Sequence, residues 1–247
     1  MKKVFLFLGV CLMAALVIVG CNKNNKPAPK PDGGEEQGGG GEEEEKDVIV
    51  IDGDFADWSA ASGVFEAYLP EGCTKVSVLA LKVTSDAKKI YIYFEQELEE
   101  GQAVSPFDFF LNTDGKDDTG ASTYLWENAG WDYLIESEAG LLASATAVRN
   151  MDDMAIYHFV GPDGEDGWAA PDYLTRTDDA GFAASAGVVQ NGIAKVELSV
   201  DREVFPEMVK NIKVGILLYE GESWTDNGLL PQGEEGALVP MMSVTLE

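Results

Sequence analysis

The sequence has few of the groups that usually carry catalysis, redox chemistry or nucleic-acid binding. It contains 3 cysteines, 1 histidine, and 17 lysines and arginines against 44 aspartates and glutamates, so its formal net charge is −27. Phosphate binding needs clustered Lys and Arg, and we therefore expect no nucleic-acid partner. Two of the cysteines lie in the first 21 residues, which leaves Cys73 alone and excludes a disulfide framework within one chain. No GxGxxG or P-loop pattern occurs, so nucleotide-dependent chemistry is not supported.

The first residues have the pattern of an export signal. Two lysines precede an apolar run from Val4 to Val19, which is shorter than the roughly 20 residues of a membrane-spanning helix. The tetrapeptide Ile-Val-Gly-Cys at 18–21 resembles the lipobox of bacterial lipoproteins, in which the cysteine thiol carries a diacylglycerol. The resemblance implies that residues 1–20 are a signal peptide, that Cys21 is lipidated, and that acyl chains anchor the protein to a membrane.

The segment that follows Cys21 has the composition of a disordered tether. Up to residue 47 it contains spaced prolines, a glycine run at 38–41 and a glutamate run at 42–45, with almost no apolar side chain. Such a segment cannot bury enough surface to offset its ordering entropy. Acidic residues after the lipidated cysteine loosely resemble the surface-export signal of Bacteroidetes lipoproteins. This implies the outer membrane and the cell surface, although the sequence leaves the periplasmic face open.

Residues 48–247 have the pattern of one all-β domain. Short runs rich in β-branched and aromatic residues alternate with Gly, Asp and Asn clusters, which predicts a β-sandwich after the tether. The expected strands are 48–51, 76–84, 90–96, 107–112, 131–136, 154–160, 181–189, 193–200, 212–219 and 241–246.

Three of these segments allow more specific expectations. Residues 90–95 are apolar or aromatic on both faces, which predicts a central strand covered on each side. Residues 194–200 alternate cleanly, so one face of that strand is expected to meet water. A helical turn is expected from Arg202 to Val209, with Asp201 as its cap and Pro206 keeping it short.

The order of short motifs in the domain resembles a known family. Ile51-Asp52-Gly53-Asp54-Phe55-Ala56-Asp57-Trp58 resembles the opening of family 9 carbohydrate-binding modules and of the wider DOMON-like sandwiches. The Tyr-rich strand near 83–96, the strand and acidic loop at 109–120, the strand at 130–136 and the Pro-containing turn at 196–206 follow in the family's order. The resemblance implies an antiparallel, jelly-roll-like β-sandwich that binds glycans without cleaving them.

Aromatic side chains are the candidate sugar contacts, because a sugar ring stacks on the flat face of Trp or Tyr. Trp58 and Trp131 occupy motif or strand positions and are expected in the core. Three other tryptophans lie in Gly- and Asp-rich segments, where they either contact ligand or cover the open end of the sandwich. The candidate ligand-binding residues are Trp126, Trp168, Tyr173 and Trp224.

An acidic segment at 112–120 is a candidate calcium site. Ca²⁺ takes six to eight oxygen ligands on a flexible loop, and Asp114, Asp117 and Asp118 supply carboxylates in close succession. The spacing does not match an EF-hand. The alternative is a polar turn built from Asp-Gly and Asp-Asp pairs.

The leading hypothesis is therefore a membrane-anchored, non-catalytic carbohydrate-binding lipoprotein, with a neutral or weakly charged glycan as partner. A scaffold subunit of an outer-membrane complex, which would bind other proteins and no small ligand, is the alternative. A glycoside hydrolase is a further alternative and requires two carboxylates flanking a cleft. With 44 acidic residues, the number of carboxylates alone does not distinguish these hypotheses.

Overall fold

The computed structural model describes residues 48–73, 77–99, 102–137, 149–150, 154–177, 182–189, 191–220 and 225–247. They belong to one compact unit, Glu45–Glu247. The predicted signal peptide, the lipidation site Cys21 and the predicted tether lie outside the described residues, and so does Trp224. Within the described ranges, no helix combines the length and the apolar character needed to cross a membrane.

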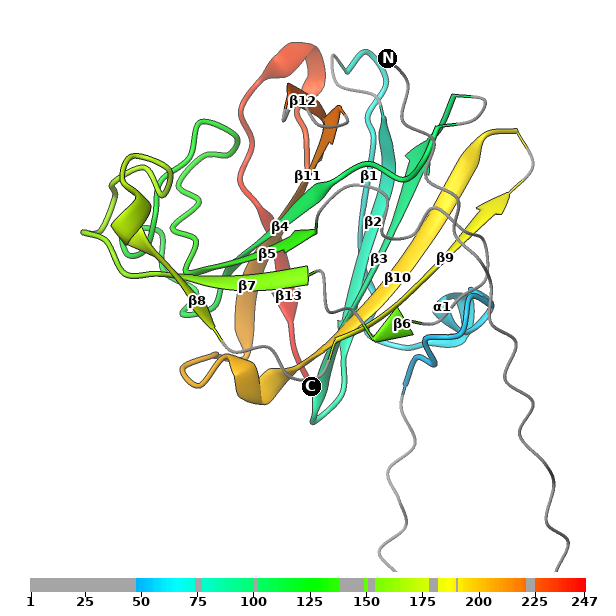
Figure 1. Cartoon of the computed structure of the whole chain (residues 1–247), viewed down its shortest axis with the longest axis horizontal. Helices are drawn as coiled ribbons and strands as arrows, with labels where there is room; N and C mark the ends of the chain where they lie inside the picture. The colour runs from blue at the N-terminus through cyan, green and yellow to red at the C-terminus, as the bar shows by residue number, and fades with distance from the viewer. Residues whose placement is uncertain are drawn as a thin grey trace, which may run out of the picture. The chain divides into compact units, whose positions relative to one another are not determined.

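Two antiparallel sheets make up the domain (Figure 1). The first sheet has the strand order β1-β2-β3-β10-β9-β6. β3 and β10 pair from Ile193 opposite Glu97 to Asp201 opposite Lys89. The strands are β1 (Phe65–Tyr68), β2 (Val78–Ser85), β3 (Lys89–Glu97), β6 (Arg149–Asn150), β9 (Ala183–Val189) and β10 (Ile193–Asp201).

The second sheet has the order β12-β11-β4-β5-β7-β8, with β13 also on β11. β11 pairs with β13 along its first half and with β12 along its second half. The strands are β4 (Phe107–Asn112), β5 (Tyr133–Ser137), β7 (Met154–Phe159), β8 (Leu174–Thr177), β11 (Asn211–Glu220), β12 (Thr225–Leu230) and β13 (Met242–Thr245). The predicted all-β antiparallel sandwich is confirmed, although β1, β6, β8 and β12 are not among the expected strands.

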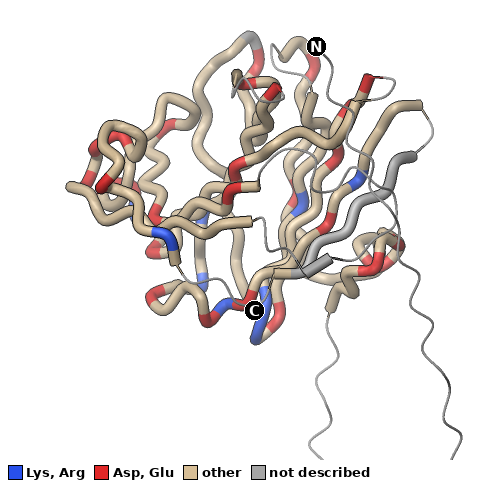
Figure 2. The backbone as a smooth tube through the Cα atoms, in the orientation of Figure 1, with Lys and Arg blue, Asp and Glu red and all other residues tan. Residues whose placement is uncertain are grey.

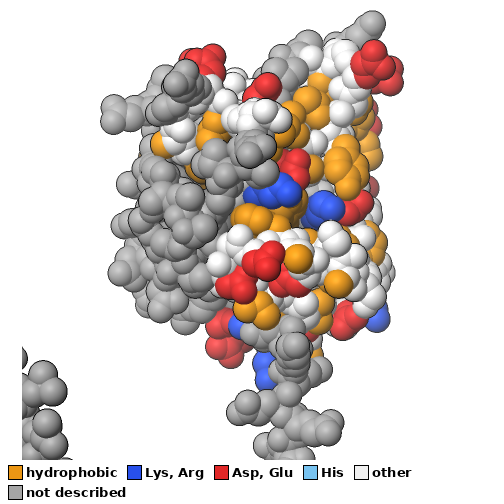
Figure 3. Space-filling model, turned by 90° about the vertical axis from the view of Figure 1, so that its right-hand side faces the viewer, with side chains coloured by type: hydrophobic (Ala, Val, Ile, Leu, Met, Phe, Trp, Pro, Cys, Tyr) orange, Lys and Arg blue, Asp and Glu red, His pale blue; other side chains and the backbone are white. Residues whose placement is uncertain are grey.

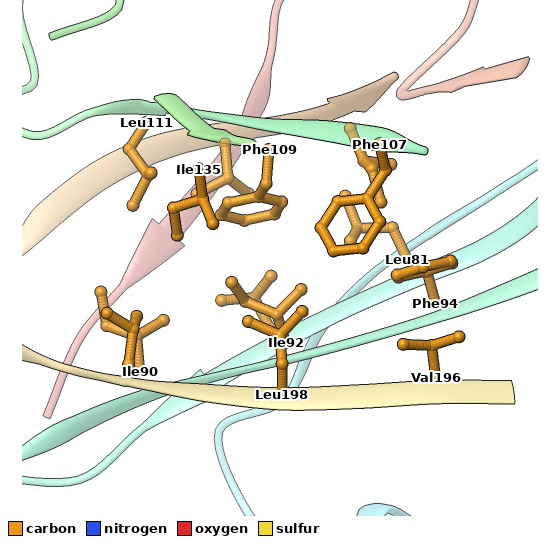
Figure 4. Close-up of a cluster of buried hydrophobic side chains, with 14 of the residues drawn as sticks. Leu81, Ile90, Ile92, Phe94, Phe107, Phe109, Leu111, Ile135, Val196 and Leu198 are labelled. Atoms are coloured by element: carbon orange, nitrogen blue, oxygen red, sulfur yellow. The ribbon is translucent and has the colours of Figure 1, made fainter. Parts of the chain in front are cut away.

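The main core lies between the two sheets (Figure 4). Because side chains alternate along a strand, every second residue of β3, β4 and β10 points into this layer. Phe94 and Phe107 meet edge to face across it, with ring centroids 5.1 Å apart. Burial of each such side chain contributes about 1.5–3 kcal/mol. The labelled core residues are Leu81, Ile90, Ile92, Phe94, Phe107, Phe109, Leu111, Ile135, Val196 and Leu198.

The N-terminal segment 48–64 packs on the outer face of the first sheet. It contains the short helix α1 (Asp57–Ala60), whose Trp58 is 4% exposed and lies 5.4 Å from the ring of Tyr93. The expected strand at 48–51 is wrong, because these residues form no strand and pack over β3 as irregular chain. Tyr91 and Tyr93 are buried under this segment, so β3 is covered on both faces as expected.

Glu197 on β10 is fully buried beneath the same segment, so the expectation that this face of the strand meets water is wrong at Glu197, whereas Lys195 on the same face is partly exposed. Its carboxylate accepts hydrogen bonds from the Trp58 indole N–H at 2.9 Å and from the backbone N–H groups of Asp52 and Gly53 at 3.0 and 2.8 Å. Burial raises the pKa of Glu197, and these three donors oppose the rise. The Asp-Gly and Asp-Trp pairs of the N-terminal motif therefore hold a buried carboxylate.

The expected helix from Arg202 to Val209 is replaced by a single turn. A 3-10 helix, η2 (Arg202–Val204), ends before Phe205, and Asp201 makes no side-chain cap hydrogen bond. Pro206 has no N–H to extend the turn, and Phe205 is buried against Tyr133 with ring centroids 5.0 Å apart. Core burial of Phe205 thus ends the helix. Among the described residues there are also the 3-10 helices η1 (Pro171–Tyr173) and η4 (Glu234–Gly236).

Charged side chains on the outer face of the first sheet are paired. Lys82 Nζ lies 2.7 Å from Glu66 Oε1 and within 5.9 Å of the Tyr68 ring centroid, and Lys195 Nζ lies 3.9 Å from Glu95 Oε1. The space-filling view of this side shows Lys and acidic side chains next to one another among hydrophobic ones (Figure 3). This face has the ordinary pattern of a solvated sheet surface.

Candidate functional site

Two connections cover the outer face of the second sheet. Residues 113–132 join β4 to β5, and residues 160–173 join β7 to β8. The two connections hydrogen-bond to each other, because Ser122 N–H donates to Glu165 O and Gly164 N–H donates to Gly120 O, both at 2.8 Å. Their apolar side chains form a second core with the outer residues of β4, β5 and β11.

Trp126 belongs to this second core, so the expectation that it is exposed for ligand contact is wrong. It is 2% exposed, its indole N–H donates to Pro231 O at 2.8 Å, and its ring meets Phe110 edge to face at 5.3 Å. A Cβ at Gly215 would lie 2.7 Å from Trp126 Cζ2, so the absent side chain makes room for the indole. Trp126 thus anchors the loop that covers the second sheet, which agrees with the alternative that it covers the sandwich, and it offers no free ring face to a sugar.

Trp168, in contrast, is 47% exposed at the edge of the same core. Its ring lies 6.4 Å from that of Trp131, which is fully buried as expected. A Cβ at Gly167 would lie only 2.2 Å from Trp131 Cζ2, so glycine allows the loop to approach and to present the next residue. The backbone N–H of Trp168 also donates to Asp166 Oδ1 at 2.9 Å, which fixes the turn.

Trp168 lines a cavity of about 340 Å³ on the outer face of the second sheet, which we call the outer-sheet cavity. Strands β4, β5 and β11 supply its floor, and β12 and the two connections supply its walls. It contains three aromatic residues, three acidic residues and two leucines. The lining residues are Asp108, Tyr124, Leu125, Glu136, Trp168, Leu217, Tyr219 and Asp226.

Asp108 is the most unusual residue of this cavity. It is 1% exposed. Its Oδ2 accepts a hydrogen bond from the Tyr219 hydroxyl at 2.5 Å, whereas its Oδ1 has no hydrogen-bond partner. Burial raises the pKa of Asp108 to about 8, the Tyr219 hydrogen bond opposes the rise, and the negative charge of Glu136 adds to it. A buried acceptor without a partner is energetically costly, so a hydrogen bond from a ligand to this group on the cavity floor would be favourable.

Tyr124 stands at the rim of the outer-sheet cavity and is 66% exposed. Its hydroxyl donates to Asp226 Oδ2 at 3.0 Å and so joins the β4–β5 connection to β12. The pKa of Tyr124 is raised to about 12, mainly by burial and secondarily by this hydrogen bond to Asp226. Tyr124 and Leu125 also line a smaller neighbouring cavity of about 150 Å³, so Tyr124 borders both this cavity and the outer-sheet cavity.

Of the remaining predicted ligand residues, Tyr173 does not join Trp168 in this cavity. Tyr173 is half-buried, packs edge to face on Phe159 at 6.0 Å, and is not among the residues that line the cavity. Trp224 lies outside the described residues, and its role stays a prediction.

Sequence reasoning missed Asp108, Tyr124 and Tyr219. One signal for Asp108 is present, because it is the only charged residue in the otherwise apolar and aromatic run 107–111. A charged residue in a strand of this kind is seldom fully buried without a partner. Tyr124 and Tyr219 have no comparable signal, since their approach to the cavity depends on pairing between segments about 100 residues apart.

The acidic segment 112–120 forms a turn held by its own hydrogen bonds. The Asp114 carboxylate accepts hydrogen bonds from the Lys116 backbone N–H and from the Lys116 ammonium group, each at 2.9 Å. It also accepts one from the Thr119 hydroxyl at 2.8 Å. Asp117 forms an ion pair with Lys213. In the part of the chain that the structure describes, no three His, Cys, Asp or Glu side chains are grouped so that they would hold a metal ion.

Calcium binding through Asp114, Asp117 and Asp118 stays a prediction that requires Lys116 and Lys213 to leave their carboxylates. If it occurs, calcium raises the thermal midpoint, because a ligand specific for the folded state stabilises it by about 2.7 kcal/mol at a hundredfold excess over its Kd. Thermal melts with calcium and with EDTA measure this change. Identical melts, with no metal in the purified protein, would mean that the segment is only a polar turn.

The comparisons with known proteins give structural similarity alone. No family model and no curated protein sequence matches the chain. Among solved structures, the chain is similar to a family 9 carbohydrate-binding module from Caldicellulosiruptor kristjanssonii in complex with glucose. The TM-score is 0.34 and the identity 13%, over 73% of this chain and 78% of that chain. For a family 9 module from the same organism in complex with cellotriose, the TM-score is 0.35 and the identity 11%, over 81% of this chain and 89% of that chain.

Proposed function

We propose that this chain is a membrane-anchored, non-catalytic carbohydrate-binding lipoprotein and that a saccharide binds in the outer-sheet cavity. One observation carries the proposal: the exposed aromatics Trp168 and Tyr124 share a cavity with Asp108, whose buried Oδ1 lacks a hydrogen-bond partner. Ligand sites combine apolar walls with a few fixed polar groups, and the cavity volume of about 340 Å³ lies near the lower end of their usual range.

The chemistry of the lining matches the two surfaces of a sugar. Trp168 and Tyr124 offer flat apolar platforms for its C–H face, and Asp108 accepts a hydrogen bond from a hydroxyl. A hydrogen bond to a charged group contributes about 1.5–3 kcal/mol, and one between neutral groups about 0.5–1.5 kcal/mol. Aromatic contact and a small number of such bonds are therefore enough for the weak binding of a single saccharide site.

The arrangement of the two floor carboxyl groups favours binding over hydrolysis. Asp108 on β4 stands directly opposite Glu136 on β5, so both side chains leave the same face of the sheet. In glycoside hydrolases the two carboxyl groups flank the scissile bond from different sides. Neighbours on one sheet face approach a ligand from the same side. Release of reducing sugar on prolonged incubation with glycans would contradict this assignment.

Lipid anchoring through Cys21 completes the proposal and rests on the sequence alone. Replacing Cys21 by Ser is expected to abolish incorporation of a labelled fatty acid, because the lipobox supplies no second thiol for the lipid. The measurement compares labelling of the parent and the variant in the native host. Continued labelling of Cys21→Ser would show that the lipoprotein assignment is wrong. A Cys73→Ser variant, which changes the remaining thiol of the domain, is the matched control and should label normally.

A further inference from the structure

We propose that the outer-sheet cavity prefers a saccharide that carries a free, protonated amino group over its neutral counterpart. The inference rests on the proposed function and names the class of sugar. Its first basis is the charge of the lining: Asp108, Glu136 and Asp226 are acidic, and the described residues that line the cavity include no Lys, Arg or His.

The second basis is the buried carboxyl group of Asp108. Asp108 lines the cavity, and its Oδ1 is enclosed by protein and accepts no hydrogen bond. A neutral hydroxyl supplies one donor and leaves the enclosed carboxyl group uncharged, because burial disfavours its ionised form. An ammonium group supplies up to three donors together with a positive charge, and hydrogen bonds between ionised partners are the stronger ones. An ammonium group beside Asp108 is therefore expected to bind more tightly than a hydroxyl in the same position.

The third basis is the aromatic part of the lining and the field around it. Trp168 and Tyr124 present exposed rings, and the faces of such rings attract cations through their quadrupole. Acidic positions are frequent in the connections near the second sheet (Figure 2), and the whole chain has a formal net charge of −27. This field raises the local concentration of a cationic ligand and lowers that of an anionic one.

Titration calorimetry of the full chain in detergent, at low salt and about pH 6, tests the inference with three β-1,4-linked trisaccharides, built from glucosamine, glucose or N-acetylglucosamine. An α-amino group has a pKa of about 7.7–8.0, and an amine that is about one pKa unit less basic is still mostly protonated at this pH. We expect the glucosamine trisaccharide to bind at least about tenfold more tightly than the other two, and we expect added salt to reduce the difference.

Two variants assign the preference to the cavity. Asp108→Asn keeps the shape of the side chain but cannot ionise beside an ammonium group, so the preference should fall to less than about threefold. Asp226→Asn changes a half-buried residue of the cavity lining and should also reduce the preference. It provides a second test if Asp108→Asn does not fold. Glu203→Gln, an exposed carboxylate of η2 outside the cavity lining, is the control and should leave the preference unchanged.

The outcomes separate this inference from the proposed function. Equal or tighter binding of the glucose trisaccharide would overturn the amine preference and leave carbohydrate binding intact. A preference that survives in both Asp108→Asn and Asp226→Asn would also overturn it, because the amine would then be recognised elsewhere. Failure of all three trisaccharides to bind overturns it as well, whereas carbohydrate binding itself is judged on a broad glycan panel.

Discussion

Replacing Trp58 by Ala is expected to lower the free energy of unfolding by about 3–5 kcal/mol, the range for truncating a buried aromatic side chain. Trp58 is 4% exposed, packs on Tyr93, and donates its indole N–H to Glu197 at 2.9 Å. The substitution therefore creates a cavity and also takes one of three donors from a buried carboxylate. Urea denaturation followed by tryptophan fluorescence or circular dichroism measures the change.

The matched control is Trp168→Ala, because Trp168 is 47% exposed and lies outside the main core. Its free energy of unfolding should remain within about 0.5 kcal/mol of the parent value, as expected for a surface substitution. A loss below about 1 kcal/mol for Trp58→Ala would show that the N-terminal segment 48–64 is not integrated with the sandwich.

Replacing Trp168 by Ala is expected to weaken saccharide binding by at least 2 kcal/mol, or roughly thirtyfold, the threshold that defines a binding hot spot. The side chain is the exposed platform of the outer-sheet cavity, and its removal leaves a ligand without that stacking surface. Calorimetry or affinity electrophoresis measures the loss, and the thermal midpoint should stay nearly unchanged.

Tyr68→Ala provides a control of similar exposure. Tyr68 is 55% exposed on β1 in the first sheet and is not part of the outer-sheet cavity lining. Its loss should leave binding unchanged. If Tyr68→Ala weakens binding as much as Trp168→Ala does, the saccharide site has been placed on the wrong sheet.

Much of the fold follows from local sequence pattern. Strands such as β3, β4 and β10 were predicted within one or two residues, because their apolar periodicity is set by the core that they bury. Strands β8 and β12 have weaker patterns: residues 174–177 and 225–227 are mostly polar and partly exposed. They form through pairing with β7 and β11, which a local pattern does not reveal.

The candidate site was less predictable, because burial there depends on distant segments. Trp126 lies in a polar, turn-rich segment, yet it is buried because Gly215, on a strand about 90 residues later, leaves space for its indole. Glu197 fits the pattern of a solvent-facing residue until the segment 48–64 covers it. Trp168 is exposed, as its turn-rich surroundings predicted, but its cavity partners Tyr124 and Asp226 meet only in the folded chain.

The central claim is that the outer-sheet cavity binds a saccharide without cleaving it. The most direct measurement is calorimetric titration of the intact protein and of Trp168→Ala across a panel of plant, host and microbial glycans. We predict that the intact protein binds at least one neutral or amino-bearing glycan, that Trp168→Ala loses this binding while keeping its thermal midpoint, and that the glycan is recovered intact. Absence of binding by the intact protein across the panel, or undiminished binding by Trp168→Ala, would contradict the account.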